Sequence, residues 1–135
     1  MDDQKQAIKA NAQFVVEQLR KLAGEWFGLN IESVEWVEGY IERLRSNTDF
    51  DESSIGGLVN TLGSFLGECI IAAAGGEWLW VEAEQTWGIS FPYNRMAFPF
   101  AKVHKQLVNG IVSGDSIVSF YDVTVNYLVT GKLEL

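Results

Sequence analysis

The sequence predicts a single α+β domain spanning residues 1–135, in which three N-terminal helices pack on a small antiparallel sheet and one or two helices follow. Apolar residues in the first half recur at steps of three and four, which is typical of helices buried on one face. The middle of the chain instead alternates apolar and polar residues in strand-forming segments. With 47% hydrophobic and 21% charged residues, the composition is that of an ordinary globular domain.

The first two helices are predicted over residues 3–27 and 31–46, with Asn30 as the N-cap of the second. Residues three or four positions apart lie on one helical face, so each helix has one apolar face to bury. The predicted apolar positions are Ile8, Ala12, Val15, Leu19, Leu22 and Trp26 in the first helix and Val34, Val37, Ile41 and Leu44 in the second.

The third helix is predicted to begin near Ser53 or Ser54 and to be apolar on nearly every side, which indicates the central helix of the fold. Gly63 and Gly67 lie one turn apart within it. An interior glycine costs roughly 0.5–1 kcal/mol relative to alanine, so we expect a bulky ring or another backbone to pack closely there. The predicted buried positions are Ile55, Leu58, Leu62, Phe65, Cys69 and Ala72.

The stretch 53–76 is also long enough to cross a membrane. It contains Glu68, however, and an acid at the centre of a bilayer costs roughly 2.5–3.5 kcal/mol. We therefore expect a buried helix in a soluble protein. The N-terminus lacks the basic region and apolar run of a signal peptide. The single cysteine, Cys69, fits a reducing compartment, and the predicted location is the cytoplasm.

Two strands are predicted over residues 78–81 and 87–91, because both segments alternate and are rich in tryptophan and β-branched residues. A short connection near Gln85 makes them a hairpin, and residues 95–98 are a candidate third strand. Leu79, Val81 and Ala83 share one face of this hairpin, whereas Trp78, Trp80, Glu82 and Glu84 share the other.

The C-terminal part is predicted to contain one or two further helices. Pro99 is suited to the first position of a helix, and Gly110 fits its C-terminal cap. Residues 116–129 fit a helix and a strand almost equally well, and we favour the helix slightly. Residues 131–135 are expected to be frayed, as chain ends usually are.

The residue types that usually carry catalysis are scarce. His104 is the only histidine, and no carboxylate partner for it is identifiable. One histidine and one cysteine do not favour a transition-metal site, and Cys69 lies on a predicted buried face beside Glu68, where a reactive thiolate is disfavoured. Neither a phosphate-binding glycine loop nor a nucleophile elbow occurs. We therefore expect no catalytic residues, no metal and no cofactor.

Glu68 nevertheless suggests an alternative function. A carboxylate in an apolar helix must be paired, hydrogen-bonded or protonated, and Arg95 is a candidate partner for it. Trp78 and Trp80 share one face of the predicted hairpin nearby. The alternative is a small-molecule-binding module or small enzyme, with a pocket between the third helix and the tryptophan hairpin at Glu68, Trp78, Trp80 and Arg95.

The strongest signal in the sequence is negative charge. With 18 acidic and 10 basic residues the net charge is −8, which disfavours nucleic acids and anionic membranes as partners. Four acids recur at steps of three, three and four on the second predicted helix, and two more follow in the next loop. These candidate partner-binding residues are Glu32, Glu35, Glu38, Glu42, Asp49 and Asp51.

Such an acidic face either keeps a protein soluble or steers a basic partner toward it. The five tryptophans of the chain add weight to recognition, because aromatic side chains anchor interfaces. The leading function is therefore a non-enzymatic protein-interaction module for a basic partner, acting as a monomer or homodimer.

A pattern of glycines, aromatics and a proline covers less than half of the chain. It reads Leu62-Gly63-x-x-Leu66-Gly67-Glu68, Gly75-Gly76-x-Trp78, Trp87-Gly88-Ile89, Phe98-Pro99-Phe100-x-Lys102-Val103 and Gly114-Asp115-Ser116-Ile117-x-x-Phe120-Tyr121. This pattern resembles a family of small uncharacterised bacterial proteins, some of which are candidate immunity proteins of polymorphic toxin systems. The resemblance implies a cytoplasmic protein that binds and masks a toxin domain, and it brings no catalytic residues with it.

Overall fold

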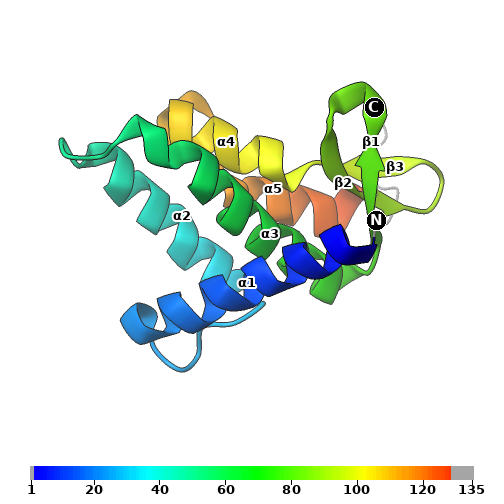
Figure 1. Cartoon of the computed structure of the whole chain (residues 1–135), viewed down its shortest axis with the longest axis horizontal. Coiled ribbons are helices and arrows are strands. Elements are labelled where there is room, and N and C mark those ends of the chain that lie inside the picture. Colours follow the sequence, from blue (N-terminus) through cyan, green and yellow to red (C-terminus); the bar gives the residue numbers. More distant parts are fainter. Residues whose placement is uncertain (1, 129–135) are drawn as a thin grey trace.

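The computed structural model describes residues 2–128, which form five α-helices and one three-stranded antiparallel sheet (Figure 1). The α+β class predicted from the sequence is thus confirmed. The elements are α1 (Asp2–Ala23), α2 (Ile31–Ser46), α3 (Ile55–Ala74), β1 (Glu77–Val81), β2 (Thr86–Phe91), β3 (Arg95–Ala97), α4 (Pro99–Asn109) and α5 (Ile117–Val123), with 3-10 turns η1 (Glu52–Ser54), η2 (Glu82–Glu84) and η3 (Ile111–Ser113) and a π-helical turn η4 (Thr124–Leu128).

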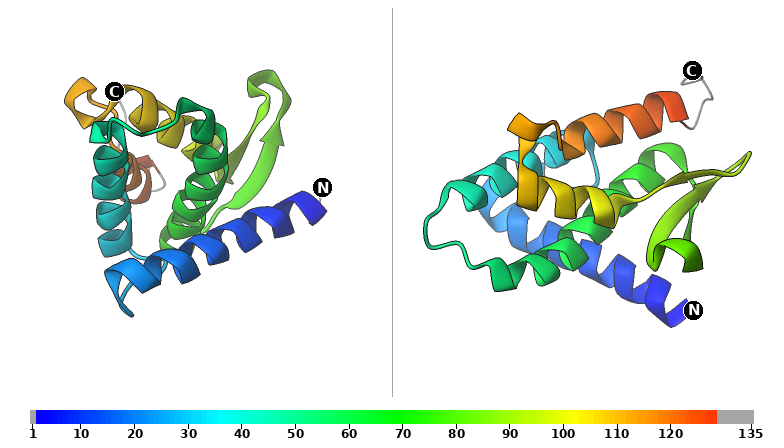
Figure 2. Two further views of the ribbon diagram at one scale, coloured as in Figure 1. Left: turned by 60° about the vertical axis from the view of Figure 1, so that its left-hand side comes forward. Right: turned by 90° about the horizontal axis from the view of Figure 1, so that it is seen from above.

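The helices are arranged differently from the expected three-helix layer on the sheet. Helices α1 and α4 both pack along α3, whereas α2 packs mainly on α5. Figure 2 shows α2 on the side of the molecule remote from the β1–β2 hairpin. The reason is that the fully buried seam of α2, formed by Val34, Val37 and Ile41, faces the other helices, so the sheet is left to α3 and α4.

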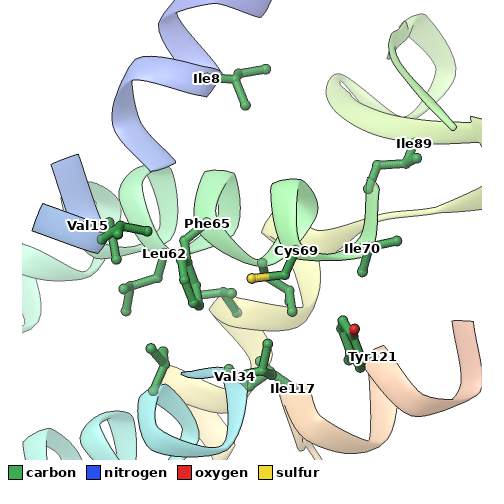
Figure 3. Close-up of a cluster of buried hydrophobic side chains, with 14 of the residues drawn as sticks. Ile8, Val15, Val34, Leu62, Phe65, Cys69, Ile70, Ile89, Ile117 and Tyr121 are labelled. Atoms are coloured by element: carbon green, nitrogen blue, oxygen red, sulfur yellow. The ribbon is translucent and has the colours of Figure 1, made fainter. Parts of the chain in front are cut away.

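Helix α3 is central, as its composition predicts. It runs between α1 on one side and α2 and α5 on the other, and its Leu62, Phe65 and Cys69 side chains fill the space between them (Figure 3). Ala72 was expected to be buried with them but is exposed, because the buried stretch of α3 ends at Ile70.

The end of α1 differs from the prediction. The helix stops at Ala23 rather than at residue 27, because Gly24 adopts a φ of +130° that breaks the helix. Leu22 and Trp26 were expected on the buried face but are 70% and 49% exposed, and Phe27 is fully buried instead. The Arg20 guanidinium fixes this turn by donating two hydrogen bonds, of 3.0 and 2.8 Å, to the Phe27 carbonyl.

The hairpin is confirmed. Strands β1 and β2 pair antiparallel, with Trp78 opposite Ile89, and β3 pairs with β2 on its other side. The connection runs through η2 and Gln85, which adopts a left-handed conformation. Trp78 is 3% exposed and Leu79 is 48% exposed. One face of β1 is therefore packed on the helices and the other faces solvent.

The predicted start and end of α4 and the favoured helix after residue 116 are confirmed. Pro99 is the first residue of α4, and Gly110 is its C-cap. The helical alternative for residues 116–129 is confirmed as far as Leu128, with Ser116 as the N-cap of α5. Residue 129 and the expected frayed end, 131–135, lie outside the described residues.

Among the described residues, one helical stretch, Glu52–Ala74, has the length and composition to cross a membrane. It comprises η1 and α3, and 44% of its most apolar 18-residue segment is buried inside the protein. The core helix of a soluble protein satisfies the same criteria, so this stretch is weak evidence for a membrane span.

Candidate functional site

The four acids of α2 lie along one side of the helix, but they do not share one environment. Glu32 and Glu35 are exposed, whereas Glu38 and Glu42 are half-buried. The helical period places Glu38 next to the apolar seam, where it meets the start of α5. On α2 the first two of these acids are therefore fully exposed, and the other two are only partly accessible to solvent.

Glu38 caps α5 from a different helix. Its Oε1 accepts a hydrogen bond of 3.2 Å from the Val118 backbone N–H and a short one from the Ser116 hydroxyl. The first N–H groups of a helix have no partner within that helix, and a carboxylate is favourable at this positive end of the helix dipole. Glu38 thus joins α2 to α5.

Gln106 of α4 completes the same junction. Its side chain is fully buried, and its Nε2 donates to the Glu38 carbonyl (3.2 Å) and to Glu42 Oε2 (3.0 Å). Its Oε1 accepts from the Ile117 N–H at 3.0 Å. The other Glu42 oxygen forms an ion pair with Arg45 at 3.1 Å. Sequence analysis missed Gln106, because a single glutamine within a helix carries no pattern.

This junction predicts a difference between two acids of the same helix. Replacing Glu38 with alanine leaves the N-cap Ser116 in place but removes the carboxylate that accepts from the Val118 N–H and the Ser116 hydroxyl, and losing a charged hydrogen-bond partner of this kind costs about 1–3 kcal/mol of stability. Replacing the exposed Glu35 with alanine should change stability by less than about 0.5 kcal/mol. Urea unfolding followed by tryptophan fluorescence measures both. Equal effects of the two substitutions would contradict the structural role of Glu38.

The two loop acids remain at the surface. Asp49 and Asp51 are both exposed between α2 and η1. Asp51 Oδ1 accepts a hydrogen bond of 2.9 Å from the Ser53 N–H, and this hydrogen bond lowers the pKa of the Asp51 carboxyl. Asp51 therefore stays ionised while it caps η1.

The four residues of the alternative pocket do not come together around one cavity. Glu68 Oε2 accepts a hydrogen bond of 2.7 Å from Trp78 Nε1, which satisfies the carboxylate without a basic partner. The Arg95 guanidinium instead lies 5.4 Å from the centre of the Tyr93 ring. Trp80 Nε1 donates to Glu82 Oε2 at 2.8 Å. Glu68 thus has a structural role, holding Trp78 against α3.

Two grooves do open beside the tryptophan hairpin. The larger, of about 770 Å³, lies between the sheet, α4 and the α5–η4 segment. The smaller, of about 430 Å³, lies between α1, α3 and the hairpin, and Trp80 is the one predicted pocket residue that lines it. Its lining residues are Gln4, Ala7, Ile8, Asn11, Gly56, Val59, Asn60, Trp80, Gln85, Thr86, Trp87 and Phe100.

The single cysteine and the single histidine lie in different surroundings, Cys69 in the core and His104 at the surface. Cys69 is fully buried, and burial, with a smaller contribution from Glu68, raises the pKa of its thiol far above the ordinary value. His104 is exposed on α4 at the larger groove. Within residues 2–128, no three His, Cys, Asp or Glu side chains are grouped to hold a metal ion.

Comparison with known proteins gives no further guide to this geometry. No family model, no curated protein and no solved structure matches the chain.

Proposed function

We propose that the protein is a non-enzymatic interaction module that binds a basic protein partner through the exposed carboxylates of α2 and the following loop. The observation that carries this proposal is that the binding carboxylates lie outside the ion pairs found within residues 2–128. These pairs join Arg45 to Glu42 and Lys102 to Asp115. None of the proposed binding carboxylates takes part in them, namely Glu32, Glu35, Asp49 and Asp51.

Apolar side chains lie near the Glu32 end of this acidic surface, at the turn between α1 and α2. Trp26 is 49% exposed and Leu29 is 42% exposed, and both precede Glu32 by only a few residues. In protein interfaces, buried aromatic anchors contribute most of the affinity. A charged rim raises the rate at which the two proteins associate. The combination supports recognition of a protein rather than simple solubility.

The resemblance to candidate immunity proteins fits a masking role in the bacterial cytoplasm. A toxin that cleaves nucleic acid needs clustered Lys and Arg to bind phosphates. An acidic protein complementary to that cluster covers the surface that the nucleic acid would occupy. A nuclease-type toxin domain is therefore the kind of basic partner that we propose.

The proposal is tested by capture from the native source lysate, with bound proteins identified by mass spectrometry. We expect wild type to retain a basic protein whose affinity falls with salt, and the Glu32→Lys, Glu35→Lys double variant to lose it. Glu38 is left unchanged, since its loss would disturb α5.

The matched control is the Glu77→Lys, Glu84→Lys double variant, which alters net charge by the same amount on exposed positions of the hairpin. This control should keep the partner. Binding that is indifferent to salt and equal in all three proteins would contradict the electrostatic proposal.

A second candidate function is small-molecule binding in the groove of about 430 Å³ beside Trp80. Its volume falls in the range of ligand pockets, roughly 300–1,000 Å³. The specific observation in its favour is that two tryptophans and several side-chain amides converge on one concave surface.

A further inference from the structure

We propose that the groove between α1, α3 and the hairpin binds an uncharged sugar ring, a pyranoside without acidic or basic groups. This inference rests on the second candidate function and names the ligand class for that groove. It follows from three properties of the lining residues: their lack of charge, their paired indoles and their amide groups.

None of the twelve residues that line this groove carries a charge, although the chain has 18 acidic and 10 basic residues. The larger groove differs, because Glu84, Lys102 and Lys105 line it. A charged ligand in the smaller groove would lose its hydration without gaining a counter-ion, which is costly. The ligand that fits is therefore neutral.

Two indole rings form one wall of the groove. Trp80 and Trp87 are cross-strand partners, and their ring centres lie 6.0 Å apart at an interplanar angle of 67°. The hydrogen bond from Trp80 Nε1 to Glu82 holds the Trp80 ring in place. A rigid indole offers a flat apolar surface at little cost in conformational entropy. The C–H face of a pyranose ring is flat and apolar in the same way.

Side-chain amides stand around these rings. Gln4 and Asn11 come from α1, Asn60 from α3 and Gln85 from the hairpin turn. Gln85 Nε2 donates to Glu82. An amide both donates and accepts hydrogen bonds. Sugar hydroxyls do the same, so amides match them in either direction, whereas a carboxylate only accepts and an ammonium only donates.

The experiment follows the indole N–H signals of the five tryptophans by proton–nitrogen NMR, with Trp80 and Trp87 assigned through their Phe variants. The probes are the methyl glycosides of glucose, galactose, mannose and N-acetylglucosamine. We expect at least one glycoside to shift the Trp80 and Trp87 signals saturably and to leave Trp36 unmoved. Glucuronate should bind the same groove about tenfold more weakly, as measured from the same two signals, which is a difference of roughly 1.4 kcal/mol.

Two variants test the amides. Asn11→Leu with Asn60→Leu keeps the side-chain size but removes the amide groups, so glycoside affinity should fall about tenfold, as expected when two hydrogen bonds are lost. Gln6→Leu with Gln18→Leu, on exposed positions of α1 outside the groove, should bind like wild type. Equal affinity of the two variants would overturn the role of the amides.

Phenol, an uncharged ring without a rim of hydroxyls, separates the ligand class from the groove itself. If phenol shifts the Trp80 and Trp87 signals and no glycoside does, the sugar proposal is wrong and the groove remains a ligand site. If neither phenol nor any glycoside shifts these signals, the second candidate function falls together with the sugar proposal.

Discussion

Phe65→Asp is expected to abolish the cooperative unfolding transition at pH 7. Phe65 is fully buried on α3, and its ring stacks on Phe27 with the centres 5.5 Å apart. Removing a buried phenylalanine ring costs about 3–5 kcal/mol, and the carboxylate adds the cost of an unpaired charge in an apolar environment. Together these approach the whole stability of a small domain, roughly 5–15 kcal/mol. The same result is expected for Leu62→Asp, because the Leu62 side chain is only 3% exposed.

The measurement is thermal unfolding followed by circular dichroism, and the matched control is Phe14→Asp. Phe14 lies on α1 and is 54% exposed, so the same chemical change there should leave a cooperative transition with a melting temperature only slightly altered. A soluble Phe65→Asp protein that melts like wild type would refute the central position of α3.

The regular elements could be predicted from the sequence where local signals agree. Asn30 caps α2 with its side chain on the Ser33 N–H, and Pro99 opens α4, so both boundaries follow from short-range chemistry. The end of α1 could not be predicted in the same way. The helical pattern continues through Trp26, but the positive φ of Gly24 turns the chain and places Phe27 in the core.

The helix arrangement and the sites depend on contacts between distant residues, which a periodic pattern does not reveal. Glu38 and Glu42 fit the acidic face of α2 by spacing alone, yet they bond to Ser116 and Gln106, more than 60 positions further along the chain. The smaller groove is likewise assembled from α1, α3 and the hairpin, so its amides could not be recognised as neighbours in the sequence.

Gly67→Ala is expected to destabilise the protein, although alanine is normally the better helix former. A Cβ at Gly67 would lie closer than 3.0 Å to two carbons of the Trp78 ring. That ring cannot easily move, since Glu68 holds its Nε1 and Phe100 packs on it at 5.6 Å between ring centres. Overpacking of this kind costs about 1–3 kcal/mol, which exceeds the roughly 0.5–1 kcal/mol that alanine gains in a helix.

Gly57→Ala is the matched control, because it lies on the same helix with nothing within 4 Å of an added Cβ. It should leave stability unchanged or raise it by up to about 1 kcal/mol, so the two substitutions should move the midpoint of urea unfolding in opposite directions. A stabilised Gly67→Ala protein would show that Trp78 is free to shift. The opposite signs would show that Gly67 is kept for the tryptophan ring that packs on it, and that this close approach couples the hairpin to α3.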